Sequence, residues 1–253
     1  MTHDAEHQLW ERLRAHTRSR IGLGRAGDAL DTSAVLELNA AHAAARDAVH
    51  SAVDVDALVA ALGALEVGEV TVVHSQAPDR ATYLRRPDLG RRPADLSALR
   101  PSQPDVAIVV CDGLSARAVT DHAVPVVEAL TGALADKSVR VVVATQARVA
   151  LGDHIAQQLG ARAVVVLIGE RPGLSVADSL GAYLTYRPQP GMADAQRNCV
   201  SNIHPPDGLD YRRAAEIVAA LLAGAVELGR SGVDLKDTSG DALSEAVRLA
   251  EVT

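Results

Sequence analysis

Phenylalanine is absent from the 253-residue sequence, and the sulfur-containing residues are rare, with two methionines and two cysteines. The two cysteines, Cys111 and Cys199, cannot build a disulfide framework, so we expect reduced thiols. Without phenylalanine, the core must consist of alanine, valine and other aliphatic side chains, which suit helices packed on a parallel sheet. A chain of this length buries enough surface to fold without disulfide bonds.

The sequence also lacks a long uncharged hydrophobic run. Its first residues carry acidic and basic side chains in place of the apolar segment of a signal peptide. No stretch reaches the roughly 18 apolar residues of a membrane helix. Lysine and arginine total 25 against 32 for aspartate and glutamate, giving a net charge of −7. This acidic balance disfavours a nucleic-acid binder, and we expect a cytoplasmic protein without a membrane or nucleic-acid partner.

Hydrophobic periodicity predicts a helical first part followed by alternating strands and helices. The expected helices lie at residues 6–19, 32–53, 54–65, 148–160, 175–180, 214–228 and 242–251, with another after residue 113 that Pro125 must break or restart. The expected strands are Val70–Ser75, Val106–Cys111, Val139–Thr145, Ala163–Glu170 and Ala182–Tyr186. Such alternation predicts an α/β fold with a Rossmann-like parallel sheet.

The segment 77–104 is rich in proline, arginine and aspartate, and we expect it to be irregular. Polar, proline-rich connections carry few crossing contacts, so this segment marks the predicted domain boundary. Residues 1–104 are then a mainly helical amino-terminal region that ends in an interface loop, and residues 105–253 a Rossmann-like domain. Arg85, Arg86, Arg91 and Arg92 lie in this loop. A solvated or interface loop is favoured over nucleic-acid contact there, with phosphate or an acidic partner surface left open.

Three predicted strands end in polar loops, where open α/β sheets bind their ligands. These loops begin at Asp112, Gln146 and Gly169. Each adjoins the start of a predicted helix, whose free N–H groups can meet a ligand. For Asp112 and Ser115, helix capping is an equally good interpretation.

Two other patterns are weak. The stretch Gly22–Gly27 matches GxGxxG, but the polar residues before it make a poor strand, so dinucleotide binding is disfavoured. We favour a tight basic turn that contacts a partner subunit. The nine histidines have no zinc-site spacing, and we expect no metal site.

Several blocks, taken in order, carry a resemblance to a known family. They are RIGLGRAG (20–27), ARDAV (45–49), DRATYLRRPDLGRR (79–92), CDGLSARAV (111–119), GERPGL (169–174), SLGAYLTY (179–186), DAQRNCVSNIHPPDGLDY (194–211) and SGVDLKD (231–237). Together they resemble the small subunit of ethanolamine ammonia-lyase. The resemblance runs from Gly22 to Asp237 and leaves out both ends of the chain.

This resemblance implies a lyase that converts ethanolamine to acetaldehyde and ammonia by a radical rearrangement that depends on adenosylcobalamin. It implies a barrel-shaped large subunit as partner, in a hetero-oligomer of paired subunits, and a bacterial microcompartment as an alternative location. The carboxyl-terminal domain would cover part of the cobalamin at the subunit interface. The family's contacts fall here on Val149, Glu170 and Cys199. No residue of this chain is expected to be catalytic or to bind the metal, because the chemistry belongs to the cofactor.

The chemistry of these residues fits such a role. An ionised Glu170 can accept hydrogen bonds from corrin amides, Val149 offers apolar contact, and Cys199 tolerates close approach. Two alternatives remain: a stand-alone α/β module that binds a small molecule, and a purely structural assembly subunit. The first predicts tight ligand binding by the isolated chain. The second predicts that substituting Glu170 or Cys199 leaves cofactor affinity unchanged.

Overall fold

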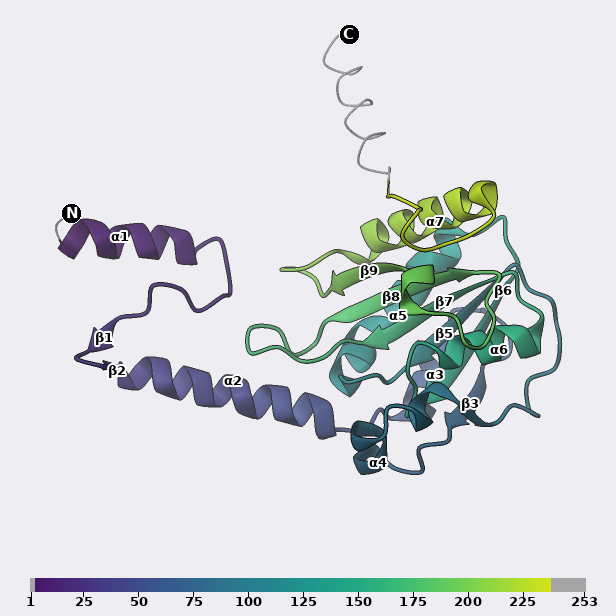
Figure 1. Ribbon diagram of the computed structural model, residues 1–253, viewed down its shortest axis with the longest axis horizontal. Coiled ribbons are helices and arrows are strands. Elements are labelled where there is room, and N and C mark those ends of the chain that lie inside the picture. Colours follow the sequence, from purple (N-terminus) through teal and green to yellow (C-terminus); the bar gives the residue numbers. More distant parts are fainter. Residues whose placement is uncertain (1–2, 238–253) are drawn as a thin grey trace, which may run out of the picture.

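The computed structural model describes residues 3–237, in which helices cover both faces of a seven-stranded sheet (Figure 1). The helices are α1 (His3–Arg14), α2 (Thr32–His50), α3 (Val55–Gly63), α4 (Arg80–Arg85), α5 (Ala116–Ala133), α6 (Leu151–Leu159) and α7 (Tyr211–Leu228), with short 3-10 turns η1 (Leu89–Arg91) and η2 (Asp194–Gln196). The strands are β1 (Arg25–Ala26), β2 (Ala29–Leu30), β3 (Thr71–Ser75), β4 (Pro93–Asp95), β5 (Val106–Cys111), β6 (Val139–Thr145), β7 (Ala163–Gly169), β8 (Leu180–Tyr186) and β9 (Asn198–Ile203).

The α/β fold is confirmed, and the centre of the sheet is parallel. The strand order is β4-β3-β6-β5-β7-β8-β9, and the neighbours β3, β6, β5 and β7 all run in the same direction. Every residue of β5 and β7 is buried. Their uninterrupted valine-rich runs have this composition because both faces of a central parallel strand are covered by helices.

The sheet as a whole is mixed, because its edge strands depart from the parallel arrangement of the centre. Strands β4, β8 and β9 pair antiparallel with their neighbours. A parallel return needs a crossover of a dozen or more residues, usually a helix. The helix expected at residues 175–180 is absent, and the chain instead returns from β7 to β8 through a loop without helix. That loop therefore sets the antiparallel direction of β8.

Two hydrophobic clusters lie on the two faces of the sheet. On one face, α3, α5 and α7 pack over residues such as Ile108 and Val165. On the other face, α6 packs over their chain neighbours Val109 and Val164. Successive residues of a strand point to opposite faces, so each central strand contributes to both clusters.

Helix α5 continues through Pro125 from Ala116 to Ala133, contrary to the predicted break. Buried residues lie on both sides of the proline, including Ala123 and Val126. Packing of both halves on the sheet thus offsets the missing hydrogen bond. The end of α6 at Gly160 is confirmed, because Gly160 is the C-cap with a left-handed backbone.

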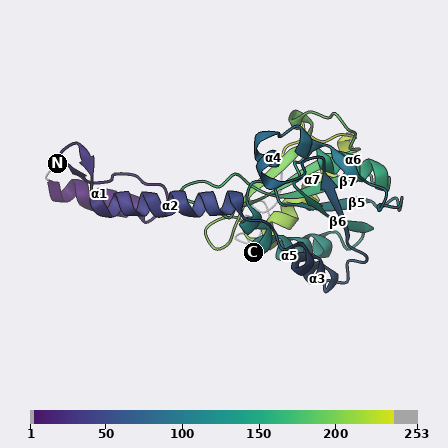
Figure 2. The same cartoon turned by 90° about the horizontal axis from the view of Figure 1, so that it is seen from below.

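An arm projects from the sheet domain. Figures 1 and 2 show α1, the β1–β2 hairpin and α2 extending away from it. Helix α1 ends at Arg14 and not at residue 19, because the chain turns back there and the Arg14 guanidinium donates to the Gly22 carbonyl at 2.7 Å. The arm meets the domain through an Arg18–Asp207 ion pair of 2.8 Å.

The division predicted at residue 104 does not coincide with a break in the sheet. Strand β3 precedes it and pairs with β6, and the segment 77–104 contains α4, η1 and β4. The part that stands apart from the sheet is the arm, which ends near His50. The predicted helix at 242–251 lies outside the described residues.

Candidate functional site

The loops that follow β5, β6 and β7 meet at the carboxyl edge of the parallel strands. Their contact is close: the N–H of Leu114 donates to the Gly169 carbonyl at 2.8 Å. A Cβ atom at Gly113 would lie 2.3 Å from that same carbonyl oxygen, and the backbone there has a positive φ of 58°. Glycine is required at position 113, because only glycine permits both this conformation and this approach.

Asp112 joins the first loop to the second. Its carboxylate accepts from the N–H groups of Gly113, Gln146 and Ala147, each at 2.9 Å. Arg80 lies 3.5 Å away. Burial raises the pKa of Asp112, and the Ala147 N–H and Arg80 oppose that rise. The side chain therefore positions the loops and caps no helix.

Ser115 caps helix α5, as the helix-capping interpretation of this residue predicted. Its hydroxyl oxygen accepts from the N–H of Ala118 at 3.1 Å at the start of α5. The same hydroxyl donates to the Ala177 carbonyl at 2.8 Å. Ser115 thus fixes the β7–β8 loop to the helix and is fully buried.

Tyr83 holds the loop that follows β6 in place. Two guanidinium groups lie over its fully buried ring, that of Arg148 at 4.4 Å and that of Arg80 at 5.0 Å from the ring centre. Its hydroxyl donates to the Ala147 carbonyl at 2.9 Å. Burial raises the pKa of Tyr83, so it stays a neutral donor. Cation–π contact and this hydrogen bond hold the loop that leads to Val149.

These loops enclose an open cavity of about 330 Å³. It is lined by Tyr83, Pro87, Arg91, Gly113, Leu114, Arg148, Val149, Ala150, Ile168, Gly169, Glu170, Arg171, Tyr183 and Asp194. Two of the predicted contact residues, Val149 and Glu170, therefore face the same cavity.

Glu170 has one oxygen fixed and one free. Its Oε2 accepts from the Ser179 hydroxyl at 2.5 Å and lies 3.5 Å from the Asn202 N–H. Its Oε1 accepts no hydrogen bond from residues 3–237 and lies over Gly181, where a Cβ atom would approach it to 2.8 Å. Gly181 thus makes room for the carboxylate, which keeps an acceptor available at the cavity.

Cys199 lies on β9, level with the middle of β7, because it pairs with Tyr183 of β8 and Tyr183 pairs with Val166. It is the register partner of Tyr183, whose hydroxyl is within hydrogen-bonding reach of the Cys199 thiol. The residue is partly exposed, but desolvation of its thiol raises the pKa. A protonated thiol is a poor nucleophile. Cys199 itself is not among the residues that line the cavity, but its neighbour Tyr183 is.

A buried ion pair beneath the cavity was not anticipated from the sequence. Arg197 donates to both carboxylate oxygens of Asp153 at 2.7 Å, and further to Thr185 at 2.8 Å. The two side chains are 1% and 0% exposed. The pair fixes α6, which begins just after Val149, to β9, which carries Cys199. Only their distance in space, and no sequence spacing, identifies them as partners.

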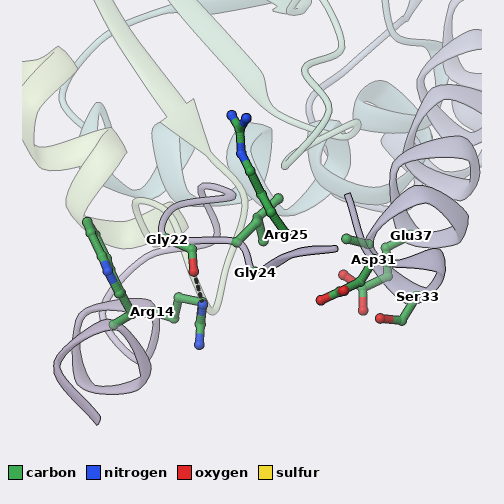
Figure 3. Close-up of a pocket in the computed structure, with 10 residues that line it drawn as sticks. Arg14, Gly22, Gly24, Arg25, Asp31, Ser33 and Glu37 are labelled. Atoms are coloured by element: carbon green, nitrogen blue, oxygen red, sulfur yellow. Dashed lines mark hydrogen bonds between the residues drawn. The ribbon is translucent and has the colours of Figure 1, made fainter. Parts of the chain in front are cut away.

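A larger cavity of about 810 Å³ lies on the arm, away from this edge (Figure 3). The Trp10 ring covers Gly22 so closely that a Cβ atom there would lie 2.2 Å from it. Figure 3 shows Arg14 and Gly22 on one side and Asp31, Ser33 and Glu37 on the other. No strand precedes Gly22 among residues 3–21, so the GxGxxG stretch forms a hairpin and no dinucleotide site.

Neither a metal centre nor a membrane span is evident in the described part of the chain. Among the side chains that the structure describes, which begin at Gln8 and reach Asp237, no three or more from histidine, cysteine, aspartate or glutamate are arranged for a metal ion. No helix among them is long and apolar enough to cross a membrane.

The fold and the site define an α/β protein with a cavity of mixed polar and apolar lining at its sheet edge and a projecting helical arm. Residues 7–236 match the family described as "Ethanolamine ammonia-lyase light chain (EutC)". The ethanolamine ammonia-lyase small subunit of Rhodococcus erythropolis is 55% identical over 96% of this chain and 95% of its own length. Those of Bradyrhizobium diazoefficiens and Xanthomonas campestris pv. campestris are 53% and 49% identical, each over 90% of this chain and over 90% and 87% of their own lengths. This chain belongs to the ethanolamine ammonia-lyase light-chain family.

Proposed function

We propose that this chain completes an adenosylcobalamin site at the interface with the ethanolamine ammonia-lyase large subunit. The assembled enzyme would convert ethanolamine to acetaldehyde and ammonia. The observation that carries the proposal is that Val149 and Glu170 line one cavity together with Tyr183, whose hydroxyl lies within reach of the Cys199 thiol.

The side chains at this edge fit the rim of a corrin. The free Oε1 of Glu170 can accept from a peripheral amide, and Val149 offers an apolar contact beside it. Tyr183 and Cys199, which pair across β8 and β9, add an uncharged ring and an uncharged thiol. When bound, the cofactor supplies a carbon-centred radical by cleavage of its cobalt–carbon bond. The chain's own task is to hold the corrin rim and to exclude water from it.

The size of the cavity supports a shared site. At about 330 Å³ it lies at the lower end of the range for drug-sized ligands, and a cobalamin is larger than such ligands. Only one edge of the cofactor fits here, so a second protein surface must cover the rest. This argument favours activity only with the large subunit, in a hetero-oligomer.

The arm is the proposed contact with that large subunit. Leu9 and Leu13 on α1 and Leu36 on α2 are exposed aliphatic side chains, and both helices belong to the projecting arm. A row of such side chains on a projecting element marks an interaction surface. We place the basic turn at Gly22–Gly27 in the same contact. The proposed location is the cytoplasm, with a bacterial microcompartment as the alternative that the family resemblance raises.

Cofactor affinity tests the proposal. The chain is co-expressed with its large subunit, and binding of cyanocobalamin is measured by equilibrium dialysis. We expect Glu170→Gln to weaken binding about five- to tenfold, because a neutral acceptor replaces a charged one. Glu227→Gln, on the exposed end of α7, is the matched control and should have no effect.

The competing functions predict different outcomes. Tight binding of cyanocobalamin or of another small molecule by the isolated chain would favour a stand-alone binding module. Unchanged affinity in both Glu170→Gln and Cys199→Ser would favour a purely structural subunit. Either result contradicts the proposed function.

A further inference from the structure

The cavity is lined by three arginines whose charges are not neutralised. Arg91, Arg148 and Arg171 all face it. Within residues 3–237, none of their guanidinium groups makes a hydrogen bond or an ion pair. The buried Nε of Arg148 is a donor without an acceptor. Donors left in this state on the wall of a cavity indicate a missing acceptor, because an unpaired buried donor is costly.

The carboxylates that line the cavity do not supply the missing acceptor for these arginines. Glu170 directs one oxygen to Ser179 and the other toward Gly181. Asp194 is 89% exposed, and its Oδ1 lies 3.8 Å from the Nε of Arg197. The arginines therefore leave a local excess of positive charge in a chain whose net charge is −7. An anionic group is the acceptor that this excess favours.

Arg148 is held in place before any ligand binds. Its guanidinium group stacks on the Tyr83 ring at 4.4 Å, and the backbone N–H of Arg148 donates to the Gly90 carbonyl at 2.8 Å. A Cβ atom at Gly90 would lie 3.0 Å from the Cγ of Arg148, so the side-chain stem packs directly on that glycine. A guanidinium group fixed in this way loses little entropy when it binds a planar or tetrahedral oxyanion.

We propose that Arg148, together with Arg91 and Arg171, forms a subsite for the phosphodiester in the nucleotide tail of adenosylcobalamin. This inference rests on the proposed function. The peripheral amides of a corrin are neutral and suit Glu170, whereas the tail carries an anion that arginine binds through paired N–H donors. Both kinds of group line the same cavity, with Glu170 as an acceptor and the three arginines as donors.

The test compares two corrinoids with the assembled enzyme. Cyanocobalamin has the phosphodiester tail, and dicyanocobinamide lacks it. Equilibrium dialysis gives the ratio of their dissociation constants for each variant, without any turnover. We expect Arg148→Gln to weaken cyanocobalamin binding at least about tenfold and dicyanocobinamide binding little, since one charge-assisted pair is lost. The preference for the tailed ligand then shrinks.

Controls separate the subsite from the rest of the site. Glu170→Gln should weaken both corrinoids equally, and Arg85→Gln, on the exposed face of α4, should change neither. Arg171 has an exposed side chain, so Arg171→Gln provides a second test of the subsite if Arg148→Gln folds poorly.

Equal losses for both corrinoids in Arg148→Gln and Arg171→Gln would overturn the subsite while leaving the proposed function intact. Weaker assembly with the large subunit at an unchanged ratio would also overturn it, and would assign the arginines to acidic side chains of that subunit. If the wild-type enzyme binds neither corrinoid, the proposed function itself fails.

Discussion

At the scale of single residues, we expect the stability of the protein to be most sensitive to substitution in the buried Asp153–Arg197 pair. Both charges are withdrawn from water, and each depends on the other. We expect Arg197→Met to lower the free energy of unfolding by about 3–5 kcal/mol, because it leaves a buried carboxylate uncompensated. Urea unfolding of the isolated chain measures this change.

The exposed pair Arg117–Asp121 provides the comparison, since Arg117→Met should cost less than about 1 kcal/mol. The double variant Arg197→Met/Asp153→Leu should recover much of the loss, because no buried charge is left alone. If the single and double variants were equally unstable, the uncompensated charge would not be the cause.

His122 makes stability depend on pH. Burial lowers its pKa from 6.5; the carboxylates of Asp121 and Asp178 oppose this, and His204 adds to it. Its Nδ1 lies 2.9 Å from the Tyr211 hydroxyl, and its Nε2 is buried without a partner. Above pH 6.5 the ring is neutral in both states. As the pH falls below that value, the unfolded chain takes up the proton more readily, so stability falls.

We therefore expect the free energy of unfolding to fall between about pH 7.5 and about pH 5.5, and His122→Asn to reduce that fall. Urea titrations at the two pH values measure both quantities. His42→Asn, at an exposed position of α2, is the control and should leave the pH dependence unchanged. Identical pH dependence in wild type and His122→Asn would rule out this residue as the source.

At the scale of an element, α5 is destabilised by its own sequence. Pro125 has no N–H to donate to the Asp121 carbonyl, yet the helix continues on both sides. We expect Pro125→Ala to raise the free energy of unfolding by about 1–3 kcal/mol, with the helix gain partly offset by a freer unfolded chain. A higher midpoint in urea would confirm this.

Pro190→Ala, in the exposed turn after β8, should change stability in the opposite direction by less than about 1 kcal/mol. A fall in stability for Pro125→Ala would mean that packing of the half-buried proline ring outweighs the restored hydrogen bond.

At the scale of the whole molecule, the arm and the sheet domain have separate tasks. Leu36 on α2 is 63% exposed, so Leu36→Ser should leave the unfolding of the isolated chain unchanged within about 0.5 kcal/mol. The same change should reduce co-purification with the large subunit, because an aliphatic side chain buried at an interface is lost.

Val233→Ser, at a 68% exposed position outside the arm, is the matched control for this change. Comparable assembly of the two variants with the large subunit would argue against the arm as the contact surface.

The accuracy of sequence-based prediction follows the locality of each feature. The limits of β5 and β6 agree with prediction, since continuous β-branched runs specify central strands whatever their partners. Strand β9 was not anticipated, because Asn198–Ile203 alternates polar and apolar residues and becomes a strand only through pairing with β8. The continuation of α5 through Pro125 was not anticipated either, because it depends on packing between distant segments.

For the candidate site too, some residues were predicted from the sequence and others were found only in the structure. Val149, Glu170 and Cys199 came from family resemblance, and no spacing in the sequence placed them together. Tyr183 and Arg148 were missed, because their roles depend on a neighbouring strand and on a ring from α4. Their cavity exists only where loops from distant parts of the chain meet.

The amino-acid sequence by itself determined the α/β class, the buried central strands and the family to which the chain belongs. These depend on runs of neighbouring residues and on local motifs. Only the tertiary structure decided the order and direction of the edge strands, the partner of Arg197 and the cavity that Val149 shares with Glu170. The physical reason is that strand pairing, desolvation and cavity shape are set by contacts between residues far apart in the chain.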